Sequence, residues 1–146
     1  MDDLTFLDTN ILVYAANEDS PYHARAKEVI QRVNRGKLAA CLSSQVLSEF
    51  YATVTNPKKV SQPLRPAEAA EAVEGYLTSS IPKLHPDENT VALTLELAKR
   101  YQITGLDIFD AQIVATMVQN RIKTLYTANE DDFTGFVEIK TINPLR

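Results

Sequence analysis

The stretch of sequence that decides the fold is Leu4-Thr5-Phe6-Leu7-Asp8-Thr9-Asn10-Ile11-Leu12-Val13. A short apolar run stops at a carboxylate, and residues with the apolar spacing of a helix follow at once. This order predicts a buried strand that ends at Asp8 and a helix that begins just beyond it. Because ligands and metals bind at the carboxyl ends of strands in parallel α/β folds, Asp8 is a candidate site residue. It is also a candidate helix N-cap, a common place for aspartate.

Composition sets the class of protein. The chain has 146 residues, of which 45% are hydrophobic and 23% charged, as in globular proteins. We expect a single domain over residues 1–146. Cys41 is the only cysteine, which excludes a disulfide framework and a cysteine-rich zinc site. The net charge of -4 argues against a broad basic surface for nucleic acid, but not against local contacts through a bound metal.

The sequence also bears on location. No apolar run approaches the length of a membrane span. The N-terminal residues Met1-Asp2-Asp3 are acidic where a signal peptide carries positive charge. We therefore expect a cytoplasmic protein without a membrane segment.

Short apolar runs alternate with longer segments of helical spacing, which predicts an α/β fold with a mostly parallel sheet of about five strands. The expected strands are Leu4–Leu7, Leu38–Leu42, Ile81–Leu84, Thr124–Tyr126 and Val137–Ile142. After the helix beyond Asp8, we expect helices at His23–Val33, from an N-cap at Ser44 to Val54, from Pro66, from Asp87 to about Tyr101, and from Asp107 to about Asn120. The loop of residues 56–65, with two prolines and two adjacent lysines, is the best candidate for a mobile segment.

Asp110 interrupts an apolar helix face. On a helix from Asp107, the side chains of Ile113, Val114 and Met117 lie within about 60° of Asp110, which predicts that it faces the core. An ionised carboxylate buried there without partners would be very costly. It could be protonated, paired with a basic residue, hydrogen-bonded by backbone donors or bound to a metal. Asp107 could add a ligand, but the N-cap is its more frequent role.

Two further acidic positions lie near predicted strand ends. Glu49 sits at the margin of the apolar face of its helix, whose first turns open at the same sheet edge as Asp8. Asp131 and Asp132 belong to an acidic loop that directly follows the strand ending at Tyr126. Solvent exposure is the ordinary explanation for such acids, but their placement beside strand exits favours a site.

The residues that are missing narrow the chemistry. The chain has two histidines without metal-ligand spacing, no glycine-rich phosphate loop and no nucleophile elbow. The candidate ligands that remain are carboxylate oxygens, which bind hard cations such as Mg²⁺ and Mn²⁺. A cation held in this way can activate water and stabilise charge on a phosphodiester.

Four segments resemble the ordered motifs of PIN-domain ribonucleases, most closely the VapC-like toxins of toxin–antitoxin pairs. They are Phe6-Leu7-Asp8-Thr9-Asn10-Ile11-Leu12, Ser44-Gln45-Val46-Leu47-Ser48-Glu49-Phe50, Ile108-Phe109-Asp110-Ala111, and Tyr126-Thr127-Ala128-Asn129 with Asp132-Phe133. Each motif alone is weak. Four in the right order over nearly the whole chain are a strong signal.

The resemblance implies a three-layer α/β/α fold and a metal-dependent endoribonuclease site. Asp8, Glu49 and Asp110 would be the metal ligands for Mg²⁺ or Mn²⁺. Where such proteins usually carry a further acid after the threonine, this chain has Asn129, so Asp132 is the better candidate for a fourth carboxylate. We expect Asn10 and Thr127 to orient the ligands by hydrogen bonds.

The resemblance also implies partners: an RNA substrate, a small antitoxin across the active-site groove and a second copy of the chain. Apolar residues on the helices from Ala67 and Thr90 favour either a dimer surface or core packing in the monomer. They include Val73, Tyr76, Leu77, Leu93 and Leu97. The alternatives in function are a catalytically silent PIN-like scaffold and, less favoured, a phosphatase-like hydrolase. The latter needs a second aspartate two residues after the first, where this chain has Asn10.

Overall fold

The computed structural model describes residues 3–146, and its centre is a five-stranded parallel sheet. The strands are β1 (Thr5–Leu7), β2 (Ala40–Ser43), β3 (Lys83–Leu84), β4 (Thr124–Tyr126) and β5 (Lys140–Ile142), in the order β3-β2-β1-β4-β5. All four pairings are parallel. Because β1 is central and β4 is its neighbour, the residues that follow these two strands meet at one edge of the sheet. The expected α/β class and sheet are confirmed.

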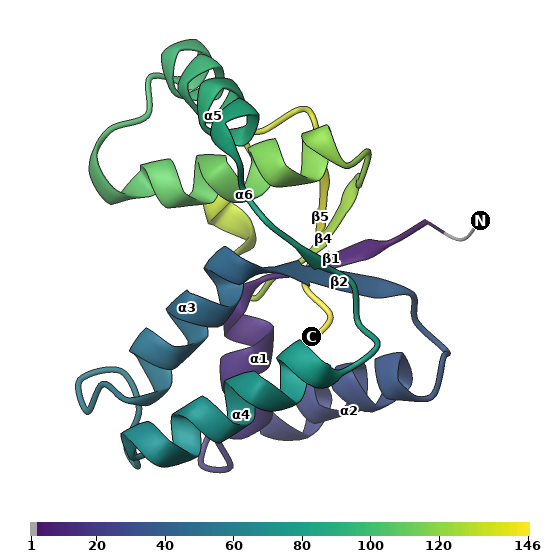
Figure 1. The fold of residues 1–146 in the computed structure, drawn as a ribbon, viewed down its shortest axis with the longest axis vertical. Coiled ribbons are helices and arrows are strands. Elements are labelled where there is room, and N and C mark those ends of the chain that lie inside the picture. The colour runs from purple at the N-terminus through teal and green to yellow at the C-terminus, as the bar shows by residue number, and fades with distance from the viewer. Residues whose placement is uncertain (1–2) are drawn as a thin grey trace.

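Helices cover both faces of the sheet (Figure 1). On one side, α5 (Glu88–Tyr101) packs on α6 (Ile108–Gln119), which the short 3₁₀ turn η1 (Gly105–Asp107) precedes. On the other side, α1 (Thr9–Ala16) packs on α2 (His23–Asn34) and α3 (Ser44–Val54), and α3 packs on α4 (Pro66–Thr78). A second 3₁₀ turn, η2 (Glu130–Asp132), lies between β4 and β5. This is the expected three-layer α/β/α arrangement.

The strands are short, and their side chains explain why they are central. Phe6, Leu7, Leu42 and Leu125 are fully buried, as parallel strands covered on both faces require. The register pairs Phe6 with both Cys41 and Leu125. Cys41 is therefore a small buried hydrophobe at the centre of the core.

Element ends differ from expectation in three ways. The strand expected at Leu38–Leu42 begins and ends later, and those expected at Ile81–Leu84 and Val137–Ile142 keep only their last residues. The predicted N-cap at Ser44 is wrong, because Ser43 caps α3 by accepting a hydrogen bond from the Val46 amide. The starts at Pro66 and after Asp87 are confirmed, and the Asp87 carboxylate caps α5. Asp107 holds the N-cap position of α6, but its side chain forms no capping hydrogen bond.

Core packing accounts for most of the apolar residues named on α4 and α5, for which a dimer surface was the alternative. Leu97 is buried, and Val73, Tyr76 and Leu93 are half-buried against the core, which leaves Leu77 exposed. Val91 and Leu95 on α5 are exposed as well. Over residues 3–146, no helix combines the length and the apolar character needed to span a membrane.

Candidate active site

Four carboxylates from four separate segments line one cavity of about 680 Å³ at the carboxyl edge of the sheet. Asp8 follows β1, Glu49 lies on α3, Asp110 lies in the first turn of α6, and Asp132 ends η2. Asn10 and Asn129 line the same cavity. The further lining residues are Thr9, Val13, Tyr14, Ala52, Thr53, Lys59, Leu106 and Phe133. The structure thus brings together six of the seven residues expected at the site around one space, and the seventh, Thr127, contacts Asp8 from below the surface.

Asp8 is buried, with 6% of its surface exposed, and is held by three donors. Its Oδ1 accepts from the Thr9 amide at 2.7 Å, which makes it the N-cap of α1. Its Oδ2 accepts from Thr127 Oγ1 at 2.8 Å and from Asn10 Nδ2 at 3.2 Å. The two explanations of Asp8 from sequence, as a cap and as a site residue, are therefore compatible.

Burial and hydrogen bonding act on Asp8 in opposite directions. Desolvation is the larger effect and raises the pKa of its carboxyl from 3.8 to about 6. The three donors lower the pKa, and the nearby Glu49 carboxylate raises it further. Among residues 3–146, no basic side chain forms a salt bridge with Asp8. The site holds a buried carboxylate by neutral donors alone.

Thr127 and Asn10 connect the two central strands. The buried Thr127 hydroxyl donates to Asp8 and accepts from Asn10 Nδ2 at 3.1 Å and from the Asn129 amide at 3.0 Å. Asn10 Oδ1 accepts from the Ala128 amide at 2.9 Å. Both side chains therefore connect the loop after β4 to the start of α1, and both donate hydrogen bonds to the Asp8 carboxylate.

Glu49 is half-buried and faces the same cavity from α3. Its Oε1 accepts a hydrogen bond from Thr9 Oγ1 at 2.9 Å. Thr9 therefore fixes two carboxylates at once, that of Asp8 by its amide and that of Glu49 by its hydroxyl. Sequence reasoning missed this role, because threonine after an N-cap is an ordinary helix residue.

Asp110 departs from its expected burial. It is half-buried, not central to the core-facing stripe, because it lies in the first turn of α6 at the edge of the sheet. Burial raises the pKa of its carboxyl to about 7, and the charges of Asp8, Asp132, Asp107 and Glu49 add to the rise. The carboxylate of Asp110 accepts no hydrogen bond from residues 3–146, so a cation is the partner that its surroundings lack.

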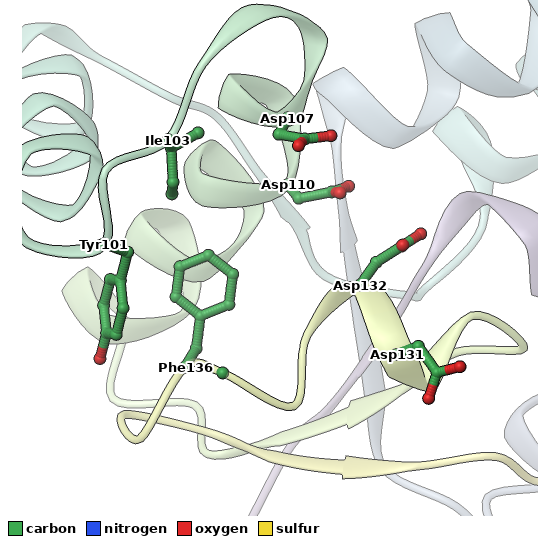
Figure 2. Close-up of a pocket in the computed structure, with 8 residues that line it drawn as sticks. Tyr101, Ile103, Asp107, Asp110, Asp131, Asp132 and Phe136 are labelled. Atoms are coloured by element: carbon green, nitrogen blue, oxygen red, sulfur yellow. The ribbon is translucent and has the colours of Figure 1, made fainter.

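A second cavity of about 340 Å³ adjoins the first and shares Asp110 and Asp132 with it. Figure 2 shows Asp107, Asp110 and Asp132 pointing toward one side, away from Tyr101 and Phe136. Asp131 points in another direction. Asp107 and Asp131 both line the second cavity and not the first, but the charge of Asp107 contributes to the raised pKa of Asp110.

The donor set fits a hard divalent cation. The candidate ligands offer oxygen atoms only. Burial is the main cause of the raised pKa values of Asp8 and Asp110, and the neighbouring carboxylates raise them further. As the side chains stand in residues 3–146, no three His, Cys, Asp or Glu are spaced to ligate one ion. The chemistry of the donors supports a metal, and the carboxylates of Asp110 and Asp132 have no hydrogen bond within the described chain to hold them in place.

The first turns of α3 and α6 are joined by a bridge that the sequence did not reveal. Gln45 Nε2 donates to the Phe109 carbonyl at 2.9 Å, and Gln45 Oε1 accepts from Gln112 Nε2 at 2.8 Å. The bridge couples the helix that carries Glu49 to the helix that carries Asp110. No sequence pattern would have found it, since the two glutamines come together only in the fold.

Comparisons with known proteins show which family this chain belongs to. The family model of the PIN domain matches residues 5–138. Ribonuclease VapC24 of Mycobacterium tuberculosis is 31% identical over 140 residues, which cover 95% of each chain. The crystal structure of Mycobacterium tuberculosis VapC20, a Sarcin-Ricin loop cleaving toxin, superimposes with a TM-score of 0.69 at 20% identity, covering 93% of this chain and 98% of that one. A toxin-antitoxin complex from Klebsiella pneumoniae gives 0.63 at 20% identity, covering 96% and 97%. At such identities the two structures confirm the fold.

Proposed function

Because this chain belongs to the PIN-domain family and is similar to VapC ribonucleases along nearly its whole length, we propose that it is a metal-dependent endoribonuclease. One observation carries the proposal: Asp8, Glu49, Asp110 and Asp132 converge on a single open cavity from four separate segments. Carboxylates that served only solubility would have no reason to gather there against their mutual repulsion.

Asp8, Glu49 and Asp110 would hold the cation, either Mg²⁺ or Mn²⁺, with Asp132 as a fourth carboxylate. A bound cation would supply the positive charge that activates water and neutralises the phosphodiester. Asp8 is the ligand fixed in advance, because Thr9, Asn10 and Thr127 keep its oxygens oriented. Asn129 lines the cavity with an uncharged side chain, so it would contribute a hydrogen bond or a carbonyl oxygen but no charge.

RNA, single-stranded or structured, is the substrate class that we propose. The cavity has a volume of about 680 Å³, and its lining combines four carboxylates with the amide side chains of Asn10 and Asn129. By analogy with the Klebsiella pneumoniae toxin-antitoxin complex, we propose that the chain is the toxin of such a pair, with a small antitoxin as its partner. A homodimer and a cytoplasmic location complete the proposal, and light scattering at high protein concentration tests the dimer.

A cleavage assay tests the activity. Purified protein is incubated with a panel of ribosomal RNA, transfer RNA and unstructured oligonucleotides, with Mg²⁺, with Mn²⁺ and with excess EDTA. We expect internal cleavage of at least one RNA that requires the cation. Full activity in EDTA would overturn the metal-dependent mechanism.

The same assay separates the enzyme from a silent scaffold. The triple variant Asp8→Ala/Glu49→Ala/Asp110→Ala should lose all cleavage while its circular dichroism stays that of the wild type. Equal activity of the two proteins would indicate a contaminating nuclease. The phosphatase-like alternative remains disfavoured, because the position of its second aspartate is Asn10, which cannot act as an acid or base and instead forms hydrogen bonds with Asp8, Thr127 and Ala128.

A further inference from the structure

Lys59 is the one basic residue among the described residues that line the carboxylate cavity. It lies in the loop between α3 and α4, and it is exposed. In a chain with a net charge of -4, a lysine beside four carboxylates would be expected to pair with one of them. Within residues 3–146, however, no carboxylate oxygen lies within 4.0 Å of its ammonium group. Its charge is therefore available to a ligand.

The backbone that carries Lys59 is fixed. The Asn56 carbonyl accepts from the amides of Lys59 at 2.9 Å and Val60 at 3.2 Å, and Asn56 Oδ1 accepts from the Lys58 amide at 2.9 Å. Val60 is packed into the core with 7% of its surface exposed. The Leu64 amide donates to the Val54 carbonyl at 2.8 Å and closes the loop onto the end of α3. The loop thus presents Lys59 at one place on the cavity wall.

The cavity wall leads from the carboxylates to this lysine. Glu49, Ala52 and Thr53 all line the cavity, and their spacing places them on one face of α3. One helical turn separates Glu49 from Thr53, a rise of about 6 Å. Lys59 lines the same cavity, and its ammonium group lies more than 4.0 Å from every carboxylate oxygen of residues 3–146. An ammonium group attracts anions, so Lys59 can bind a negatively charged group that the carboxylates would repel.

On the basis of the proposed function, we propose that Lys59 binds a phosphate of the RNA that neighbours the scissile one. Phosphates repeat along the strand, so a phosphate at the carboxylates places another one along the groove. A lysine acts there as a point charge and contributes affinity without base specificity. Lys59 is thereby a substrate-binding residue that positions the RNA backbone in the cavity whatever the RNA sequence.

The adjacent Lys58 provides a matched control. It is exposed, has the same charge, and does not line the cavity. The test compares the wild type with Lys59→Gln, Lys58→Gln and Lys59→Arg, using the RNA of the panel that the wild type cleaves fastest. The measurements are KM and kcat over a series of salt concentrations, and thermal unfolding without metal.

For Lys59→Gln we expect KM to rise about three- to tenfold at low salt, the range for one exposed charged contact, with little change in kcat. Its plot of log KM against log salt concentration should be shallower by about 0.7, the value for one phosphate contact on a single strand. Lys58→Gln should keep the slope of the wild type, and Lys59→Arg should restore most of the affinity.

Two other results have distinct meanings. If Lys59→Gln and Lys58→Gln have the same KM and salt slope, the inference is wrong although the ribonuclease activity stands. If Lys59→Gln keeps the slope and instead unfolds at a lower temperature without metal, Lys59 is an internal counter-ion of the carboxylates, which also overturns the inference. Absence of any cleavage by the wild type would be a failure of the proposed function itself.

Discussion

The two sides of the carboxylate cavity are built in different ways. On the side of β1 and β4, the oxygens of Asp8 accept three hydrogen bonds, and Thr127 and Asn10 are fully paired. On the side of α6 and η2, the carboxylates of Asp110 and Asp132 accept none from residues 3–146 and point the same way (Figure 2). Both sides carry negative charge, but only the first is fixed.

This difference indicates separate roles for the two sides in the proposed reaction. The fixed side would supply one metal ligand in a set orientation, and hydrogen bonds there limit the cost of burying its charge. The side of α6 and η2, called the adjustable side below, would be free to orient its carboxylates toward a cation. The arrangement disfavours the charged carboxylates in the metal-free protein: burial, and to a smaller extent repulsion between the acids, raises the pKa values of Asp8 and Asp110.

The largest expected effect is the loss of cleavage in Asp8→Ala and in Asp110→Ala, each by more than about 100-fold, beyond the range for residues that only orient ligands. Both changes remove an unfavourable charge. Only Asp8→Ala leaves the donors of Asn10 and Thr127 without an acceptor and removes an N-cap. Asp110→Ala should therefore unfold at a higher temperature than Asp8→Ala. The opposite order of melting temperatures would contradict the contrast between the two sides.

Metal should stabilise the folded protein by relieving the same repulsion. At a concentration of Mn²⁺ about 100 times Kd, mass action adds about 2.7 kcal/mol, which raises Tm by about 5–10 °C in a domain of this size. Asp110→Asn should shrink the rise, because it removes charge from the adjustable side. Thermal unfolding at several Mn²⁺ concentrations checks this. An unchanged Tm for the wild type at millimolar Mn²⁺ would count against metal binding at these carboxylates.

Thr127→Val tests the fixed side without removing a ligand. The change keeps the shape of a fully buried side chain but deletes the hydroxyl that donates to Asp8 and accepts from Asn10 and the Asn129 amide. We expect metal affinity to fall about 10- to 100-fold and stability to fall by about 1–3 kcal/mol. Titration calorimetry with Mn²⁺ and urea unfolding measure the two effects. Wild-type affinity in a folded variant would show that Asp8 does not need this support.

The sequence predicted much of this site because its signals are local. Asp8 directly after the first strand, Thr127 directly after β4 and the acids on α3 and α6 each follow from an apolar run and its boundary. Hydrogen bonds link Asp8, Asn10 and Thr127, because the neighbouring parallel strands β1 and β4 end at the same edge of the sheet.

The contacts that the sequence could not predict are those between side chains from distant segments. The Thr9 hydroxyl on Glu49 and the Gln45 bridge to α6 join residues 40 or more positions apart, and no periodicity encodes such pairs. The burial of Asp110 was overestimated because a helical wheel takes no account of where a helix begins. Asp110 lies in the first turn of α6, at the edge of the core. Lys59 belongs to a loop that composition alone favoured as mobile.

The pH dependence of stability should depend on both sides of the cavity, through Asp8 on the fixed side and Asp110 on the adjustable side. Folding raises the pKa of Asp8 to about 6 and of Asp110 to about 7, from an ordinary 3.8, so the folded state favours the protonated forms. The corresponding stability is complete below about pH 4 and is lost as the pH rises through 6 and 7. Metal-free protein should therefore lose stability between about pH 4 and 7, and Mn²⁺ should restore it at the upper end. If the stability of Asp110→Asn does not change over this pH range, Asp110 alone accounts for the pH dependence and Asp8 contributes nothing to it.

The smallest expected effect separates two adjacent acids of η2. Both side chains are exposed, but Asp132 lines the carboxylate cavity, whereas Asp131 does not line it and points elsewhere (Figure 2). Mg²⁺ usually keeps several waters, so water can replace an exposed loop ligand, and Asp132→Ala should lower kcat/KM by about three- to tenfold. Asp131→Ala removes the same charge from the same turn and should leave cleavage unchanged. Equal losses in the two variants would mean that the turn acts through its total charge and that the adjustable side has only Asp110 as a ligand.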